Sequence, residues 1–147
     1  MPKPAAERHD PLRETADALC RGSEECCHQH ERLAHILSVA CSDEELAGVA
    51  AVSDMCDAIL VKQIAAYEQA ASGGRGKAPE AWWHAANTLW HTAREYHRRH
   101  EQCNQTSTRL ARHSAAKLGE LTMEFELEAS AVLGLRHAVG GYTKACS

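Results

Sequence analysis

The sequence has little that would form a β-sheet. Of its 147 residues only Phe125 is a phenylalanine, valine and isoleucine are sparse, and alanine, leucine, glutamate and arginine dominate. β-Branched and aromatic residues favour strands, whereas the residues that dominate here favour helices. We therefore expect an all-α fold without a sheet.

Long apolar runs and a charge of one sign are also missing. The first ten residues contain no stretch that could act as a signal peptide, and no later stretch reaches membrane-spanning length without a charge. The 16 lysines and arginines are scattered among 20 acidic residues, with a formal net charge of -4. We expect a cytoplasmic protein that binds neither a membrane nor nucleic acid.

Cysteine and histidine are, in contrast, plentiful. The chain has seven cysteines and ten histidines. An odd number of thiols in a reducing compartment argues against a disulfide framework. The sequence also lacks a CxxC pair, which would have indicated a metal site. We expect no cofactor, although zinc, copper and haem are the ligands that this composition would suit.

The apolar residues recur every three or four positions, which predicts helices. The predicted ranges are 11–40, 43–71, 79–104 and 107–139. Asp10 followed by Pro11 is typical of a helix start. We expect residues 1–147 to form one domain, an antiparallel up-down four-helix bundle, with a loose or disordered arm at 1–9 and a flexible loop at 72–78 between two hairpins.

The end of the third helix has two interpretations. The polar stretch 103–107 contains turn and capping residues, so we place a turn there and end the fourth helix at Gly140-Gly141. In the alternative, the third helix continues unbroken to about Lys117 and breaks at Gly119, which would make the helices unequal in length.

A first candidate site follows from the first hairpin. Residues equally far from the turn of an antiparallel hairpin lie at the same height. A turn just before Ser42 places Cys26 level with Cys56 and His30 level with Ser53. Thiolates and imidazole suit zinc or copper, so Cys26, His30 and Cys56 form a candidate metal site. Alternatively the thiols only pack and His30 is hydrogen-bonded, which is the outcome we expect.

A second candidate site lies on the third helix. His97, His100 and Cys103 share one broad face and could hold a metal ion. However, ligands three residues apart spread around the helix axis, which disfavours chelation of one ion. Pairs such as Glu95 with Arg98 indicate instead a solvated, charged face.

Glu128 is the one acid that we place facing the core. A turn near Gln105 puts Glu128 level with Trp83, whose indole N–H can donate to the carboxylate. The same turn pairs Ala93 with Leu118, Trp90 with Leu121, and Ala86 with Phe125. If the seam drifts by one residue, Ala129 faces inward and Glu128 is exposed.

No catalytic motif is complete. The interval from His30 to His35 is one residue too long for a zinc-protease helix, and Glu25 with His28 is a single ferritin-like pair. His91 and Glu95 have a hemerythrin-like spacing but lack companion histidine pairs. We therefore do not expect an enzyme.

A second column of cysteines flanks the first seam. Cys20, Cys27 and Cys41 follow a spacing of seven residues, with Ala34 at the intervening position. They are either half-buried packing residues or a contact with another subunit. Helices with more than one apolar stripe bury more than one face. We expect a non-enzymatic interaction or oligomerisation protein whose partner is itself or another protein. The alternative is a metal- or haem-binding bundle for storage or sensing.

Overall fold

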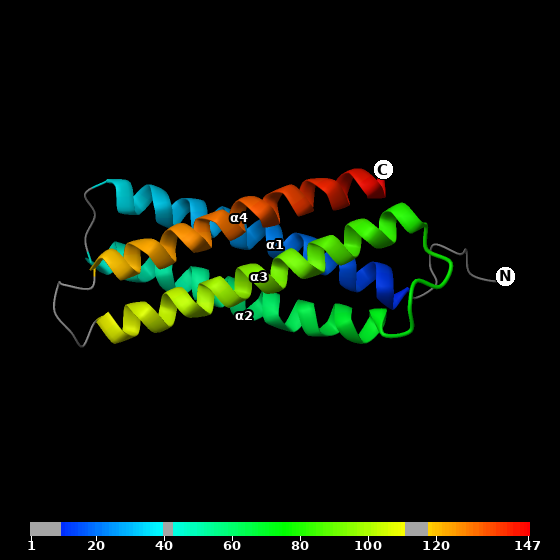
Figure 1. Cartoon of the computed structure of the whole chain (residues 1–147), viewed down its shortest axis with the longest axis horizontal. Coiled ribbons are helices and arrows are strands. Elements are labelled where there is room, and N and C mark those ends of the chain that lie inside the picture. The colour runs from blue at the N-terminus through cyan, green and yellow to red at the C-terminus, as the bar shows by residue number, and fades with distance from the viewer. Residues whose placement is uncertain (1–9, 40–42, 111–117) are drawn as a thin grey trace.

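The fold is a bundle of four long antiparallel helices (Figure 1). The computed structural model describes residues 10–39, 43–110 and 118–147, and within these ranges it contains no strand. The helices are α1 (Pro11–Ser38), α2 (Asp43–Ala71), α3 (Glu80–Leu110) and α4 (Leu118–Cys146). The predicted all-α, up-down four-helix bundle is confirmed. The predicted arm at 1–9 and the first turn at 40–42 lie outside the described residues.

The start of α1 and the loop before α3 follow the sequence closely. The Asp10 carboxylate accepts a hydrogen bond from the Arg13 backbone N–H at 3.2 Å, and Pro11 occupies the first turn. Residues 73–77 form an exposed loop, as predicted. Gly74 (φ 85°) and Gly76 (φ 59°) adopt the left-handed conformation that glycine allows without steric cost.

The predicted turn at 103–107 is wrong, because α3 runs without interruption to Leu110. The alternative with a continuous third helix is correct as far as Leu110, and residues 111–117 lie outside the described part. Polar residues in a helix interior cost only tenths of a kcal/mol, which tertiary contacts easily offset. Asn104 supplies such a contact, since its side-chain amide donates to Asp54 of α2 at 2.8 Å.

The predicted end of the fourth helix at Gly140-Gly141 is also wrong, since α4 continues to Cys146. Two mid-helix glycines cost about 1 kcal/mol each relative to alanine. The residues on either side, Val139 and Tyr142, are buried in the core, and their burial offsets that cost. The break expected at Gly119 in the alternative is wrong as well, because α4 begins at Leu118 and the four helices have 28, 29, 31 and 29 residues.

The two hairpins pack side by side. The closest pairs are α1 with α2 and α3 with α4, while α1 also packs on α4 and α2 on α3. Across the diagonals α1 contacts α3, whereas the described parts of α2 and α4 have at most a marginal contact. Each of these two helices therefore presents a broad outer face. No helix in the described ranges is long and apolar enough to cross a membrane.

The core is apolar toward the end of the bundle that holds the loop between α2 and α3. Its fully buried side chains include Leu19, Leu60, Tyr67, Leu89 and Leu135. On α3, Ala86 and Ala93 face the core as predicted. The neighbouring Trp82 and Leu89 are buried, whereas Trp83 and Trp90, which we expected on the core side, are only half-buried.

The cysteine column of α1 packs inside the chain. Cys20 and Cys27 are buried and lie against α4, where the Cys27 thiol is 3.8 Å from the Val132 carbonyl oxygen and the Cys20 sulfur is 4.0 Å from the Thr143 hydroxyl. These two residues therefore serve the α1–α4 contact and not a contact with another subunit. Cys41 lies outside the described residues.

Candidate functional site

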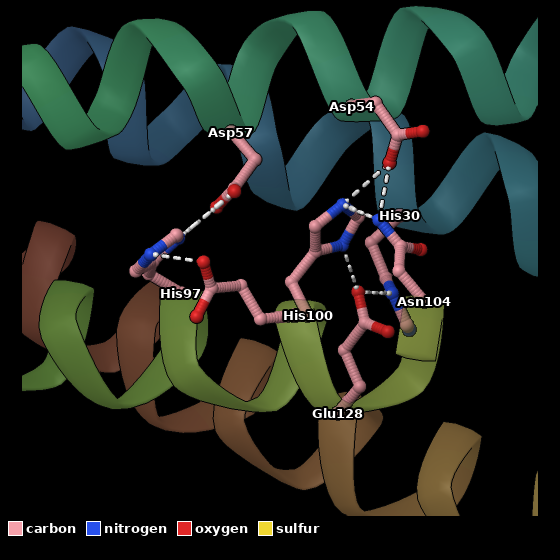
Figure 2. A network of polar contacts seen from close by, with 8 residues as sticks. His30, Asp54, Asp57, His97, His100, Asn104 and Glu128 are labelled. Atoms are coloured by element: carbon pink, nitrogen blue, oxygen red, sulfur yellow. Dashed lines mark hydrogen bonds and ion pairs between the residues drawn. The ribbon is translucent and has the colours of Figure 1, made fainter. Parts of the chain in front are cut away.

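The other half of the bundle buries charge. Glu128 of α4 and His100 of α3 have exposed fractions of only 3% and 4%, and Glu128 Oε1 lies 2.8 Å from His100 Nδ1 (Figure 2). We call the set His30, Asp54, Asp57, His97, His100, Asn104 and Glu128, which forms two neighbouring groups of contacts, the polar network. It draws residues from all four helices, so it can form only after both hairpins have docked.

His100 is held between two carboxylates. Its Nδ1 contacts Glu128, and its Nε2 lies 2.8 Å from Asp54 Oδ1 of α2. Asn104, one turn later on α3, donates to the same Asp54 oxygen. Because Asp54 is exposed, the chain of polar contacts leads from the buried Glu128 to the protein surface (Figure 2).

His30 of α1 is the second imidazole beside Glu128. Its Nδ1 is 3.6 Å from Glu128 Oε1, which is longer than a hydrogen bond but close enough for an ion pair. Its ring stacks on Phe125, with 5.0 Å between the ring centroids. Two imidazoles from different hairpins thus share one carboxylate oxygen.

A second group of contacts lies beside the first. The carboxylate of Asp57 lies against His97 Nδ1, with its oxygens at 2.8 and 3.0 Å. The opposite ring nitrogen of His97 is 3.3 Å from Glu101. Asp57 is buried whereas Glu101 is exposed, so this group also connects the interior with solvent.

The electrostatic balance favours an ion pair at the centre. Burial by itself would raise the pKa of Glu128, but the hydrogen bond from His100 and the nearby His100 and His30 side chains outweigh it and lower that pKa to about 2. Burial would lower the pKa of His100, but Glu128, Asp57 and Asp54 raise it to about 9. At neutral pH the network therefore contains an imidazolium beside a carboxylate.

Asp57 behaves differently. Burial raises its pKa, and the contact with His97 and the charge of His100 only partly oppose that effect. Asp57 is thus the member of the network whose charged form is least favoured by its surroundings. A buried carboxylate of this kind is costly unless its hydrogen-bond partner stays in place.

The thiols of the predicted first site lie in an unreactive environment. Cys26 is fully buried and Cys56 is half-buried, and the two are close enough for the charge of Cys56 to affect the pKa of Cys26. Burial raises the pKa of both thiols. They therefore remain protonated at neutral pH, which makes them poor nucleophiles. No disulfide joins cysteines within the described ranges.

Two further buried polar groups accompany the thiols. Ser53 is 2% exposed, and the Tyr96 ring is fully buried. The Tyr96 hydroxyl and His30 Nδ1 are among the few buried polar atoms that have no hydrogen-bond partner within the described residues. The interior at this height is therefore polar but incompletely satisfied, which is unusual for a bundle core.

The structure connects the two candidate sites that the sequence analysis treated separately. His30 from the first set and His100 from the second both approach Glu128. Cys103 is buried, one turn from His100 on α3. In the described parts of the chain, no group of three or more histidine, cysteine, aspartate or glutamate side chains has the arrangement of a metal site.

The prediction that Glu128 faces the core is confirmed, but its predicted partner is wrong. Glu128 contacts His100 instead of Trp83, because the continuous α3 moves the hairpin turn toward the C-terminus and shifts the register by several helical turns. The same shift overturns the predicted pair of Ala86 with Phe125, since Phe125 stacks on His30. The pairs involving Leu118 and Leu121 concern side chains that the structure does not describe.

Asp54, Asp57 and Asn104 are the network residues that the sequence did not reveal. The two aspartates are three residues apart on α2 and so point in similar directions, toward α3. Acids on a helix are usually solvated, so the spacing of the two aspartates does not by itself predict that they face inward. Only together with the histidine-rich face of the third helix does it indicate a contact between α2 and α3. Comparison with known proteins adds no further guide, as no family model, curated protein or solved structure matches the chain.

Proposed function

We propose that this chain is a non-enzymatic, cytoplasmic helical-bundle protein that acts through association with a second copy of itself. The observation that carries the proposal is an apolar stripe on the outer face of α2. Val52, Met55 and Ile59 have exposed fractions of 39%, 64% and 53%. Because they are three and four residues apart, their side chains lie along one line of the helix.

The surroundings of the stripe favour a protein partner. Ala51 and Ala58, which flank it, are also exposed and are small enough to let another helix approach closely. Single exposed apolar residues are common on protein surfaces, whereas an aligned row indicates an interaction site. Leu133 on α4 is a single residue of this kind, 69% exposed with Ser130 and His137 as exposed neighbours.

The polar network supports a structural role instead of catalysis. Both ring nitrogens of His100 are engaged by carboxylates, and the buried thiols are held in their protonated form. General acid–base catalysis requires a group that can reach a substrate proton. Ion pairs that join four helices, in contrast, favour one arrangement of the helices over others.

Light scattering or sedimentation on the full chain tests the proposal. We expect a mass above one subunit at micromolar concentration. Met55→Glu buries a charge in the proposed interface and should produce monomers. Leu133→Glu, the matched control on α4, makes the same chemical change outside the stripe and should leave the mass unchanged. A monomeric wild-type chain at tens of micromolar would contradict the proposal.

Metal or haem binding remains the alternative, with zinc or copper at Cys26, His30 and Cys56. Less supports it, since the described His, Cys, Asp and Glu side chains include no group of three arranged to hold a metal ion. Elemental analysis and an absorption spectrum of untagged protein test it directly. Near one equivalent of zinc or copper per chain, lost in Cys56→Ser, would favour the alternative over self-association.

A further inference from the structure

The outer stripe of α2 is complementary to itself when reversed. Its exposed residues include, in order, Glu45, Gly48, Val52, Met55, Ile59 and Lys62. They follow one another at steps of three and four residues, so they occupy one face of the helix. When the row is reversed, Glu45 corresponds to Lys62, and the small Gly48 corresponds to the large Ile59. Val52 and Met55 correspond to each other in the apolar centre.

We propose that two chains pair α2 against α2 in antiparallel orientation, about a twofold axis between Val52 and Met55. This inference rests on the proposed function and specifies its geometry. In an antiparallel helix pair, residues equally far from the axis face each other. Val52 then meets Met55 of the partner subunit, and Gly48 meets Ile59 of the partner subunit.

Gly48 provides the first support for this register. It lies inside α2, where glycine is less favourable than alanine. A Cβ atom added at Gly48 would meet no heavy atom within 4 Å, so no packing within the described chain explains the glycine. The proposed pairing explains it, because the large Ile59 side chain of the second copy requires space at that position.

Charge provides the second support. At the ends of the paired region, Lys62 faces the acidic first turn of α2 from the other subunit, which carries the exposed Glu44 and Glu45. The twofold axis repeats this attraction, giving two oppositely charged contacts per dimer. A parallel pairing would instead place Lys62 beside Lys62 and the acidic turns beside each other. Like charges at such positions are destabilising, so the charges favour the antiparallel orientation.

Charge reversal with sedimentation analysis tests the register. In Lys62→Glu, two attractive contacts become repulsive, so the dissociation constant of the dimer should increase about tenfold, as two exposed pairs of up to about 0.7 kcal/mol imply. Adding Glu45→Lys to that variant reverses both partners and should return the dissociation constant to within about threefold of the wild-type value.

Lys77→Glu is the matched control, because it makes the same charge change in the exposed loop before α3 and should not affect association. Circular dichroism of each variant confirms that the bundle is folded. If the wild-type chain is a dimer but Lys62→Glu associates normally, or Glu45→Lys fails to restore association, the antiparallel register is overturned while the proposed function stands. A monomeric wild-type chain overturns both.

Discussion

Around the middle of α2, the usual contrast between a buried apolar face and an exposed polar face is reversed. Asp57, on the inner face, is 7% exposed, while Met55, two residues earlier on the outer face, is 64% exposed. Asp57 is tolerated inside because His97 offers a ring nitrogen to its carboxylate. The comparison teaches that burial in this bundle follows available partners and not polarity alone.

The largest effect on stability is expected at Glu128, in the centre of the polar network. Glu128→Gln removes one member of a buried ion pair and leaves the His100 imidazolium beside a neutral amide. Breaking such a pair costs about 3–5 kcal/mol, so the free energy of unfolding in urea should fall by about that amount. Glu126→Gln, an exposed position on the same helix, is the control and should change stability by less than about 0.5 kcal/mol. An equal effect of the two variants would contradict a stabilising network.

The polar network should also make the free energy of unfolding depend on pH. The pKa of His100 is raised from 6.5 to about 9, so its contribution is complete below pH 6.5 and is lost as the pH rises toward 9. The pKa of Glu128 is lowered from 4.5 to about 2, so its contribution is complete above pH 4.5 and is lost as the pH falls toward 2. We expect the greatest stability between pH 4.5 and 6.5, with a decrease of about 2–3 kcal/mol by pH 9.

Urea unfolding at a series of pH values measures this profile. His100→Gln removes the titrating group and should flatten the profile between pH 6.5 and 9, whatever its effect on absolute stability. His84→Gln, which changes an exposed histidine on the same helix, should keep the wild-type slope. An unchanged slope in His100→Gln would mean that another group causes the alkaline loss.

A smaller effect on stability is expected when glycines are replaced by alanine. Its sign depends on whether the glycine faces a neighbouring helix or faces outward. A Cβ atom at Gly22 of α1 would overlap the Gln63 side-chain amide of α2, whereas one at Gly134 of α4 would meet no heavy atom within 4 Å. Gly22→Ala should therefore destabilise the fold by about 1–3 kcal/mol through overpacking. Gly134→Ala should stabilise it by up to about 1 kcal/mol through helix propensity. Thermal unfolding of both variants measures the difference, and a stabilising Gly22→Ala would show that Gln63 moves aside without cost.

The accuracy of the sequence predictions depended on the strength of the local signals. Asp10 with Pro11 and the glycine-rich loop at 73–77 marked boundaries that the structure confirms, because capping and left-handed backbone conformations depend on residues close in sequence. The polar stretch at 103–107 and Gly140-Gly141 misled the analysis. Their unfavourable helix propensities are small compared with the tertiary contacts of Asn104, Val139 and Tyr142.

What the sequence determined by itself was the set of helices and, for α1 and α4, which side chains face inward. The three-and-four spacing along α1 predicted that Cys26 and His30 are buried, and the seam of α4 predicted that Glu128 faces inward. Such periodicity depends only on the geometry of one helix.

Only the tertiary structure decided which imidazole meets which carboxylate. Glu128 meets His100 because the length of α3 sets the register of the second hairpin, and it meets His30 because the two hairpins dock across the bundle. Moving a hairpin turn by a few residues brings different side chains to the same height without altering the periodicity of either helix. The choice between registers therefore depends on contacts between residues far apart in sequence, whose energies no local pattern reveals.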